Sequence, residues 1–165
     1  MPEKKTIERA RKDAREGKAP STQAGEFVHE EIDHIREGKH GARSTKQAIA
    51  IGLSKARRAG IKLPPPKAGK ASARTRTQAA RDVNKGKSPG RATSSTRSRA
   101  IRTALQREGR QAASSQSLSR QARTSARSRG ASNRSQAAQK AVRTKGAAGL
   151  RSAARKAART RAAGR

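Results

Sequence analysis

Apolar residues recur at helical spacing in the first third of the chain. A thin stripe of Ile7, Ala10 and Ala14 predicts a helix over about 3–16. A fuller stripe predicts a second helix between residues 22 and 38. The expected members of its buried face are Ala24, Phe27, Val28, Ile32 and Ile35.

A third helix has the clearest start and stop signals. Ser44 and Gln47 fit the capping box S-x-x-Q, in which the two side chains satisfy the first free backbone N–H groups. Gly60 would end the helix, and Ile61 would fold back against it. The apolar positions between these signals follow the spacing i, i+4, i+7 and are Ile49, Leu53 and Ala56.

The pattern changes after the triple proline at 64–66, which cannot continue a helix. The rest of the chain is built from Ala, Arg, Ser, Gln and Thr, and Ile101 with Leu105 is its one apolar i, i+4 pair. Short Gly-punctuated blocks of this kind are marginal as isolated helices, so we expect them to become helical on contact with phosphates. The glycine breaks lie near 86–90, 109, 130, 146–149 and 164.

Composition sharpens this picture into an expected fold class. Ile, Leu, Val and Phe together number 16 of 165 residues, and ten of them precede residue 67. So little apolar material with so high a charge is typical of disorder. We therefore expect a mainly α protein: a small three-helix module over 1–62, a Pro-rich linker over 63–70, and a largely disordered basic tail over 71–165 with short Ala/Arg-rich helical blocks.

The positive charge is concentrated in the predicted tail. The chain carries a net charge of +31, of which residues 1–66 hold +6 and residues 67–165 hold +25. Only Asp82 and Glu108 are acidic in the second part. Such a charge calls for a polyanionic partner, and nucleic acid is the commonest intracellular polyanion.

Arginine dominates the tail, and it binds phosphate through two parallel hydrogen bonds. The tail has no aromatic residue on which an unpaired base could stack, which favours duplex DNA over single strands. The predicted phosphate contacts are Arg97, Arg99, Arg102, Arg107, Arg110, Arg120, Arg123, Arg127, Arg129, Arg151, Arg155, Lys156, Arg159 and Arg161.

The module itself offers a smaller set of basic residues on and after its third helix. These are Lys46, Lys55, Arg57, Arg58 and Lys62. They suggest a helix-turn-helix, but the link over 38–43 is longer than the usual turn, and the preceding helix is acidic. Its acids could pair with tail arginines, bind a protein partner or simply face solvent. They are Glu26, Glu30, Glu31, Asp33 and Glu37.

Other kinds of chemistry find little support. Cysteine is absent, and His29 and His34 lie five residues apart, whereas two histidines that share a helix face are four apart. We therefore expect no metal site, no cofactor, no catalytic residues and no enzymatic activity. No apolar stretch resembles a secretion signal or a membrane span, which predicts a cytoplasmic protein without membrane contact. The segment 87–91 is expected to be a plain turn with little tendency to enter a DNA groove.

Residues 6–66 resemble a family of small, basic, uncharacterised proteins found mainly in proteobacteria, grouped under a domain of unknown function. The matching stretch is TIERARKDAREGKAPSTQAGEFVHEEIDHIREGKHGARSTKQAIAIGLSKARRAGIKLPPP. The resemblance implies at most the DNA-binding label that some members carry, and it assigns no site residues. The tail is similar in composition to the histone-H1-like tails of bacteria, although it favours Arg where those tails are often Lys-rich.

The function we expect is non-enzymatic, largely sequence-independent binding of double-stranded DNA by a nucleoid-associated or architectural protein. Two alternatives stay open. The protein could be an adaptor whose residues 1–62 bind a protein partner or form a homodimer, or its partner could be RNA.

Overall fold

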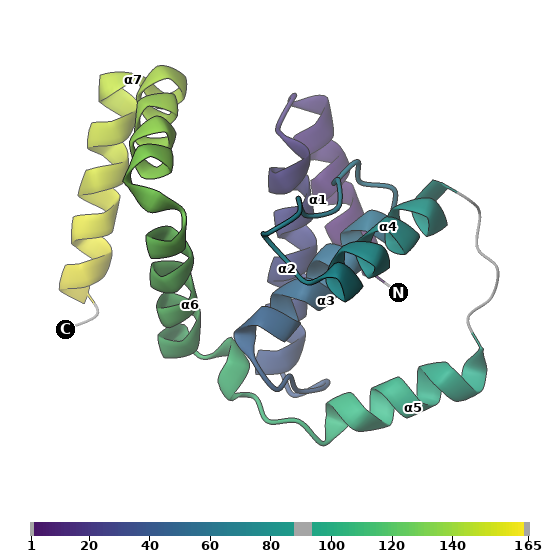
Figure 1. Ribbon diagram of the computed structural model, residues 1–165. Helices are drawn as coiled ribbons and strands as arrows, with labels where there is room; N and C mark the ends of the chain where they lie inside the picture. Colours follow the sequence, from purple (N-terminus) through teal and green to yellow (C-terminus); the bar gives the residue numbers. More distant parts are fainter. Residues whose placement is uncertain (1, 88–93, 164–165) are drawn as a thin grey trace. The chain divides into compact units, whose positions relative to one another are not determined.

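The computed structural model describes residues 2–87 and 94–163 (Figure 1). Within these ranges the secondary structure is helical, with seven α-helices and one 3-10 helix. The elements are α1 (Lys4–Arg15), α2 (Pro20–Arg36), α3 (Thr45–Arg58), α4 (Ala73–Lys87), α5 (Ser95–Gln106), η1 (Gln111–Ala113), α6 (Ser115–Ser128) and α7 (Gly130–Ala163). The predicted turn at 87–91 falls largely outside the described residues.

The chain divides into two compact units, 1–119 and 120–165. In the first unit α1 packs on α2, α2 on α3, and α3 on α4 (Figure 1). The 3-10 helix η1 packs on α2 and α3. The first unit therefore includes segments from well beyond the triple proline.

The three helices predicted for the N-terminal module are confirmed. The hydroxyl of Ser44 accepts a hydrogen bond from the backbone N–H of Gln47 at 3.2 Å, as the capping box requires. The side chain of Gln47 accepts from Arg43 N–H at 3.0 Å, one residue earlier than the usual reciprocal bond. At the other end Gly60 has φ +90°, and Ile61 N–H donates to Ala56 O at 3.1 Å, which closes the helix in a Schellman-type turn.

The core of the first unit consists of two small clusters. Phe27 is fully buried with Ala10, Ala24 and Ala56, and Ile7, Leu53, Ile61 and Leu63 pack around them. The second cluster contains six buried residues from α2, α3, η1 and the loop before α3. They are Ile32, Ile35, Ala42, Ala48, Ala112 and Ala113. Alanine thus supplies most of the buried residues in each cluster. Such small side chains let the helix backbones approach closely.

The expectation of a three-helix module followed by a largely disordered tail is wrong. The helix α4 buries Ala79 and Asp82 against α3. The segment after α5 is held by backbone hydrogen bonds, in which Gly41 N–H donates to Leu105 O at 2.8 Å and Ala42 N–H donates to Gly109 O at 3.1 Å.

Two side chains of the module also hold the backbone of Ala112 and Ala113, further along the same segment. The hydroxyl of Thr45 donates to Ala112 O at 2.7 Å, and Nε of Arg36 donates to Ala113 O at 3.1 Å. A count of large apolar residues could not reveal this packing, because alanines and backbone carbonyls make the contacts.

The second unit is helical as well, without a core of its own. No residue described in 120–163 is buried. Its helices therefore depend on the high helix propensity of Ala and Arg. Two glycines with positive φ mark breaks in it. Gly130 (φ +74°) is the first residue of α7, and Gly146 (φ +62°) kinks that helix into two arms.

Candidate nucleic-acid interface

The second unit carries positive charge with nothing to neutralise it. Residues 120–165 contain 14 Lys/Arg and no Asp or Glu. Each of the 13 that the structure describes is exposed. The ion pairs found among the described residues all lie between residues 3 and 82, so none involves this unit. These cations are therefore available to phosphates.

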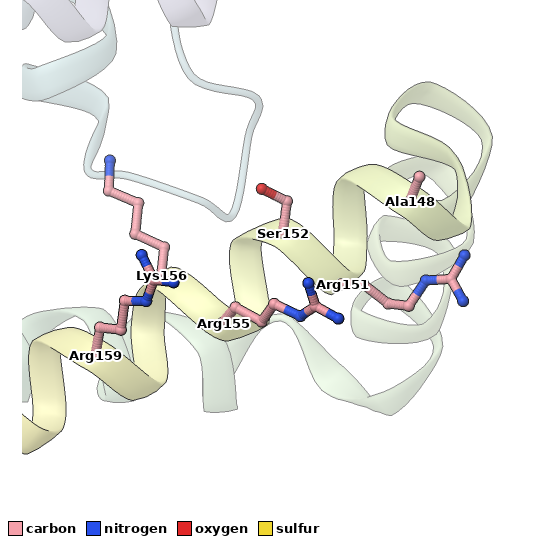
Figure 2. A pocket seen from close by; sticks show the side chains of 6 residues that line it. All are labelled: Ala148, Arg151, Ser152, Arg155, Lys156 and Arg159. Atoms are coloured by element: carbon pink, nitrogen blue, oxygen red, sulfur yellow. The ribbon is translucent and has the colours of Figure 1, made fainter.

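One side of the second arm of α7 gathers several of these cations. Figure 2 shows the six side chains that line a hollow along this side, and we call them the α7 face. They are Ala148, Arg151, Ser152, Arg155, Lys156 and Arg159. At 3.6 residues per turn these positions fall on one side of the helix, with small residues between the long basic ones. A phosphate backbone could approach the helix closely between the cations.

A second, shorter stripe lies on α6. Arg120, Arg123 and Arg127 follow the spacing i, i+3, i+7 and so share one side of that helix, and all three are exposed. Arg129 is exposed between α6 and α7. Arg161, near the end of α7, is also exposed.

The predicted phosphate contacts on and after α5 are exposed, but they do not lie on one side of the helix. Arg97, Arg99 and Arg102 lie on different sides of α5, and no residue of that helix is buried. Arg107 and Arg110 follow the helix and are exposed. They do not form a single basic face.

In the module, three of the five predicted phosphate contacts have internal partners. Nζ of Lys55 lies 3.3 Å from Glu30 Oε1 and 2.6 Å from Glu31 Oε2. Arg58 Nε donates to Asp82 Oδ1 at 2.8 Å. Lys46 and Lys62 are exposed and free for a phosphate, since no ion pair among the described residues includes them.

The third internal residue is Arg57, which is 7% exposed. Its guanidinium donates to Leu63 O at 3.3 Å and to Pro64 O at 3.4 Å. Burial lowers the pKa of Arg57, and the negative charge of Asp82 partly opposes that shift. Arg57 therefore anchors the start of the proline segment to α3 and is not positioned to reach DNA.

The acids of α2 are also used within the module. Glu30 and Glu31 are buried and pair with Lys55. The more exposed acids form ion pairs with nearby basic residues: Glu26 with Arg9 at 3.8 Å, Asp33 with His29 at 2.8 Å, and Glu37 with Lys39 at 2.9 Å. Among the described residues, no arginine of the tail forms an ion pair with α2. The acids of α2 therefore mainly pair with basic residues of the module itself.

The structure also brings together three residues that sequence spacing did not connect. One potential metal-ligating atom from each of Glu31, His34 and His40 lies within 4.8 Å of the other two. Glu31 and His34 are three residues apart on one side of α2, and a turn at Gly38 (φ +78°) returns His40 to them. The E-x-x-H spacing was visible in the sequence, but the return of His40 depends on that turn.

These features define a mainly helical, strongly basic protein. Among the described residues its ion pairs all lie in the first unit, and the cations of the C-terminal unit form none. Residues 3–67 match the model of a family described as "Family of unknown function (DUF6496)". No curated protein matches the chain, and no solved structure matches it either. Among the described helices, none combines the length and the apolar character that crossing a bilayer requires.

Proposed function

We propose that this protein binds double-stranded DNA through phosphate contacts made by its C-terminal unit, as a non-enzymatic, nucleoid-associated or architectural protein. The observation that carries the proposal is the segregation of charge. Every described Lys and Arg after residue 119 is exposed and forms no ion pair, whereas the module uses most of its charged residues on itself. Charge that is not neutralised within a protein attracts a polyanion.

The side chains on the surface of the C-terminal unit favour contact with the DNA backbone over recognition of bases. The α7 face presents arginine and lysine, which bind phosphates, with no carboxylate or amide beside them to read cytosine or adenine. Stacking on bases would need aromatic side chains, and Phe27, the one aromatic residue of the chain, is fully buried in the module. Binding should therefore depend weakly on sequence.

The module contributes little charge to this binding. Lys55, Arg57 and Arg58 are held by internal partners, which leaves Lys46 and Lys62 from the set predicted around α3. We therefore assign the module at most a minor direct part in phosphate binding. Direct groove reading by α3 would require the ion pairs with Glu30, Glu31 and Asp82 to break.

A salt series on three forms of the protein tests the proposal. Gel shifts would compare the full chain, residues 1–119 and residues 120–165 on the same duplex. If about ten phosphates are contacted, the logarithm of affinity should fall with the logarithm of salt concentration at a slope of about −9. The full chain and 120–165 should show this steep slope. Residues 1–119 carry 28 Lys/Arg and 11 Asp/Glu, and should show a shallower slope because part of that charge is paired internally.

Two results would overturn the proposal. One is an affinity of 120–165 that does not change with salt. The other is a set of partners retained after nuclease treatment that map to 1–119, which would make the protein an adaptor. Competition between duplex DNA and structured RNA at equal phosphate concentration identifies the nucleic acid, and a preference for RNA would replace DNA in the proposal.

A further inference from the structure

The buried carboxylate of Glu31 has an unusual environment. Its side chain is 0% exposed, and neither oxygen accepts a hydrogen bond from any described residue. The ammonium of Lys55 lies 2.6 Å from Oε2 and supplies charge, but without hydrogen-bond geometry. A buried carboxylate normally has hydrogen-bond donors around both oxygens. Lys55 is the charged partner of Oε2, so Oε1 is the oxygen whose missing donor a ligand could replace.

His40 faces the same carboxylate with its second ring nitrogen. Nδ1 of His40 lies 3.1 Å from Gly41 O, and because a carbonyl can only accept, Nδ1 carries the proton. In the neutral ring Nε2 then presents a lone pair, and it lies 3.4 Å from Glu31 Oε1. Two lone pairs that face each other at this distance repel unless a proton or a cation lies between them.

The remaining contacts complete a set of donors. His34 projects from α2 one turn after Glu31, and its Nε2 lies 2.8 Å from Oε1 of Glu3, which is half exposed. The side chains of His34 and His40 are 13% and 16% exposed, so the cluster is partly open to solvent. The other charged groups that face it are Lys39, Lys55 and Glu30.

We propose that Glu31, His34 and His40 bind a divalent transition-metal ion of the zinc class, with Glu3 or water in the fourth position. Two imidazoles and a carboxylate are ligands that Zn²⁺ accepts, and the hydrogen bond from His40 Nδ1 to a carbonyl is the usual outer support of a metal-binding histidine. Bonds of about 2.1 Å in a tetrahedron separate ligand atoms by about 3.4 Å, close to the spacing of His40 Nε2 and Glu31 Oε1.

Binding would stabilise the module. The proton on Nε2 of His34, which lies 2.8 Å from Glu3 Oε1, would move to Nδ1 when Nε2 binds the ion. The ion would connect the start of α1, the last turns of α2 and the loop before α3, and this loop also holds the segment after α5. An ion that binds the folded state and not the unfolded state raises the melting temperature.

The test uses the full chain without an affinity tag, titrated with ZnCl2 in a calorimeter and with CoCl2 in a visible-absorption cell. The expected result is one ion per chain, a cobalt spectrum of tetrahedral type and a higher melting temperature. His34→Ala and His40→Ala should each weaken Zn²⁺ binding at least about 100-fold, since even an outer-shell partner of a metal ligand typically contributes 10- to 100-fold.

His29 provides the matched control. It lies on the same helix, its side chain is 65% exposed, and it pairs with Asp33 outside the cluster. His29→Ala should bind Zn²⁺ as the unaltered chain does. Equal loss in His29→Ala and His40→Ala, or no saturable binding to the full chain, would overturn the proposal.

A second variant keeps the test decisive if a histidine variant fails to fold. Lys55→Met removes the cation beside Glu31, so this variant should lose stability and regain it with Zn²⁺. The double variant Lys55→Met, His40→Gln should not regain it. If Lys55→Met loses stability and Zn²⁺ does not restore it, the cluster is an ion-pair site only. That result would contradict the proposal.

Discussion

Nε of Arg58 on α3 donates to Oδ1 of Asp82 on α4 at 2.8 Å, across 24 residues of sequence. The carboxylate is 1% exposed, whereas the arginine side chain is 48% exposed. Ser54 and Gln78 donate to the same carboxylate at 2.7 and 3.1 Å. Asp82 is one of two acids after residue 66, and the contact shows that it joins α4 to the module.

Replacing Asp82 should therefore detach α4. Asp82→Ala leaves the hydroxyl of Ser54 and the amide of Gln78 without a partner, while the half-exposed Arg58 regains water. We expect a loss of about 2 kcal/mol in the free energy of unfolding, measured by urea titration, because hydrogen bonds to charged groups typically contribute about 1.5–3 kcal/mol.

Glu108 supplies the control for this variant. It is the other acid of 67–165, and its carboxylate forms no ion pair among the described residues. Glu108→Ala should leave the urea midpoint nearly unchanged. A loss for Glu108→Ala equal to that for Asp82→Ala would assign the effect to net charge alone.

Gly41 should be intolerant of any side chain. A Cβ at this position would overlap the carbonyl oxygen of Glu108. Gly41→Ala should then break the hydrogen bonds that hold 105–109, at a cost of about 1–3 kcal/mol typical of overpacking. Limited proteolysis should show faster cleavage near residues 94–110.

Gly25 is the matched control for a new methyl group. It is exposed within α2, and a Cβ there would meet nothing within 4 Å. Gly25→Ala should stabilise the module by about 0.5–1 kcal/mol, because alanine favours helix over glycine. Destabilisation by both variants, with no change in proteolysis near 94–110, would argue against the packing of that segment.

These contacts also explain which parts of the structure the sequence could predict. The module helices followed from strong local signals at Ser44, Gly60 and the apolar stripe of α2. The packing after the prolines did not, because Ala79, Ala112 and Ala113 are buried by shape and by backbone hydrogen bonds that leave no periodic apolar signal.

The same limit applies to the candidate interface. The basic residues were evident from composition, but their availability was not. Arg58 and Arg129 look alike in the sequence, yet Asp82 holds one and no acid exists near the other. Partners distant in sequence decide which cations remain free, and only the tertiary structure shows them.

Lys18 gives a prediction about pH. Its ammonium lies 2.7 Å from Asp13 and 2.8 Å from Glu16. The hydrogen bond that Lys18 donates to Asp13, followed by the one it donates to Glu16, raises the pKa of Lys18. The bond from Lys18 also lowers the pKa of Glu16. The stability linked to Lys18 is present below 10.5 and is lost as pH rises through its folded pKa. The stability linked to Glu16 is present above 4.5 and is lost as pH falls through its folded pKa.

The difference in melting temperature between the unaltered chain and Lys18→Met should thus be largest near neutral pH, shrink toward acid pH, and begin to shrink above pH 10.5. Lys5→Met is the control, because Lys5 is exposed and forms no ion pair among the described residues. Thermal unfolding from pH 3 to 11 measures both. A difference for Lys18→Met that does not vary with pH would contradict the expected coupling.

The α7 face should contribute more to DNA binding than its charge alone. Replacing Arg151, Arg155, Lys156 and Arg159 with Gln removes four positive charges from one side of the helix. If each contacts a phosphate, the slope of log affinity against log salt should become shallower by about 3.6, at about 0.9 per contact. Salt-dependent fluorescence anisotropy on a short duplex measures this slope.

The first arm of α7 offers a control of equal charge. Arg134, Lys140, Arg143 and Lys145 are also four exposed cations, but at 100° per residue they point to different sides of the helix. A duplex can meet only some of them at once, so their replacement with Gln should change the slope by about half as much or less. Equal changes for the two sets would mean that the unit attracts DNA as a diffuse polycation, without a preferred face.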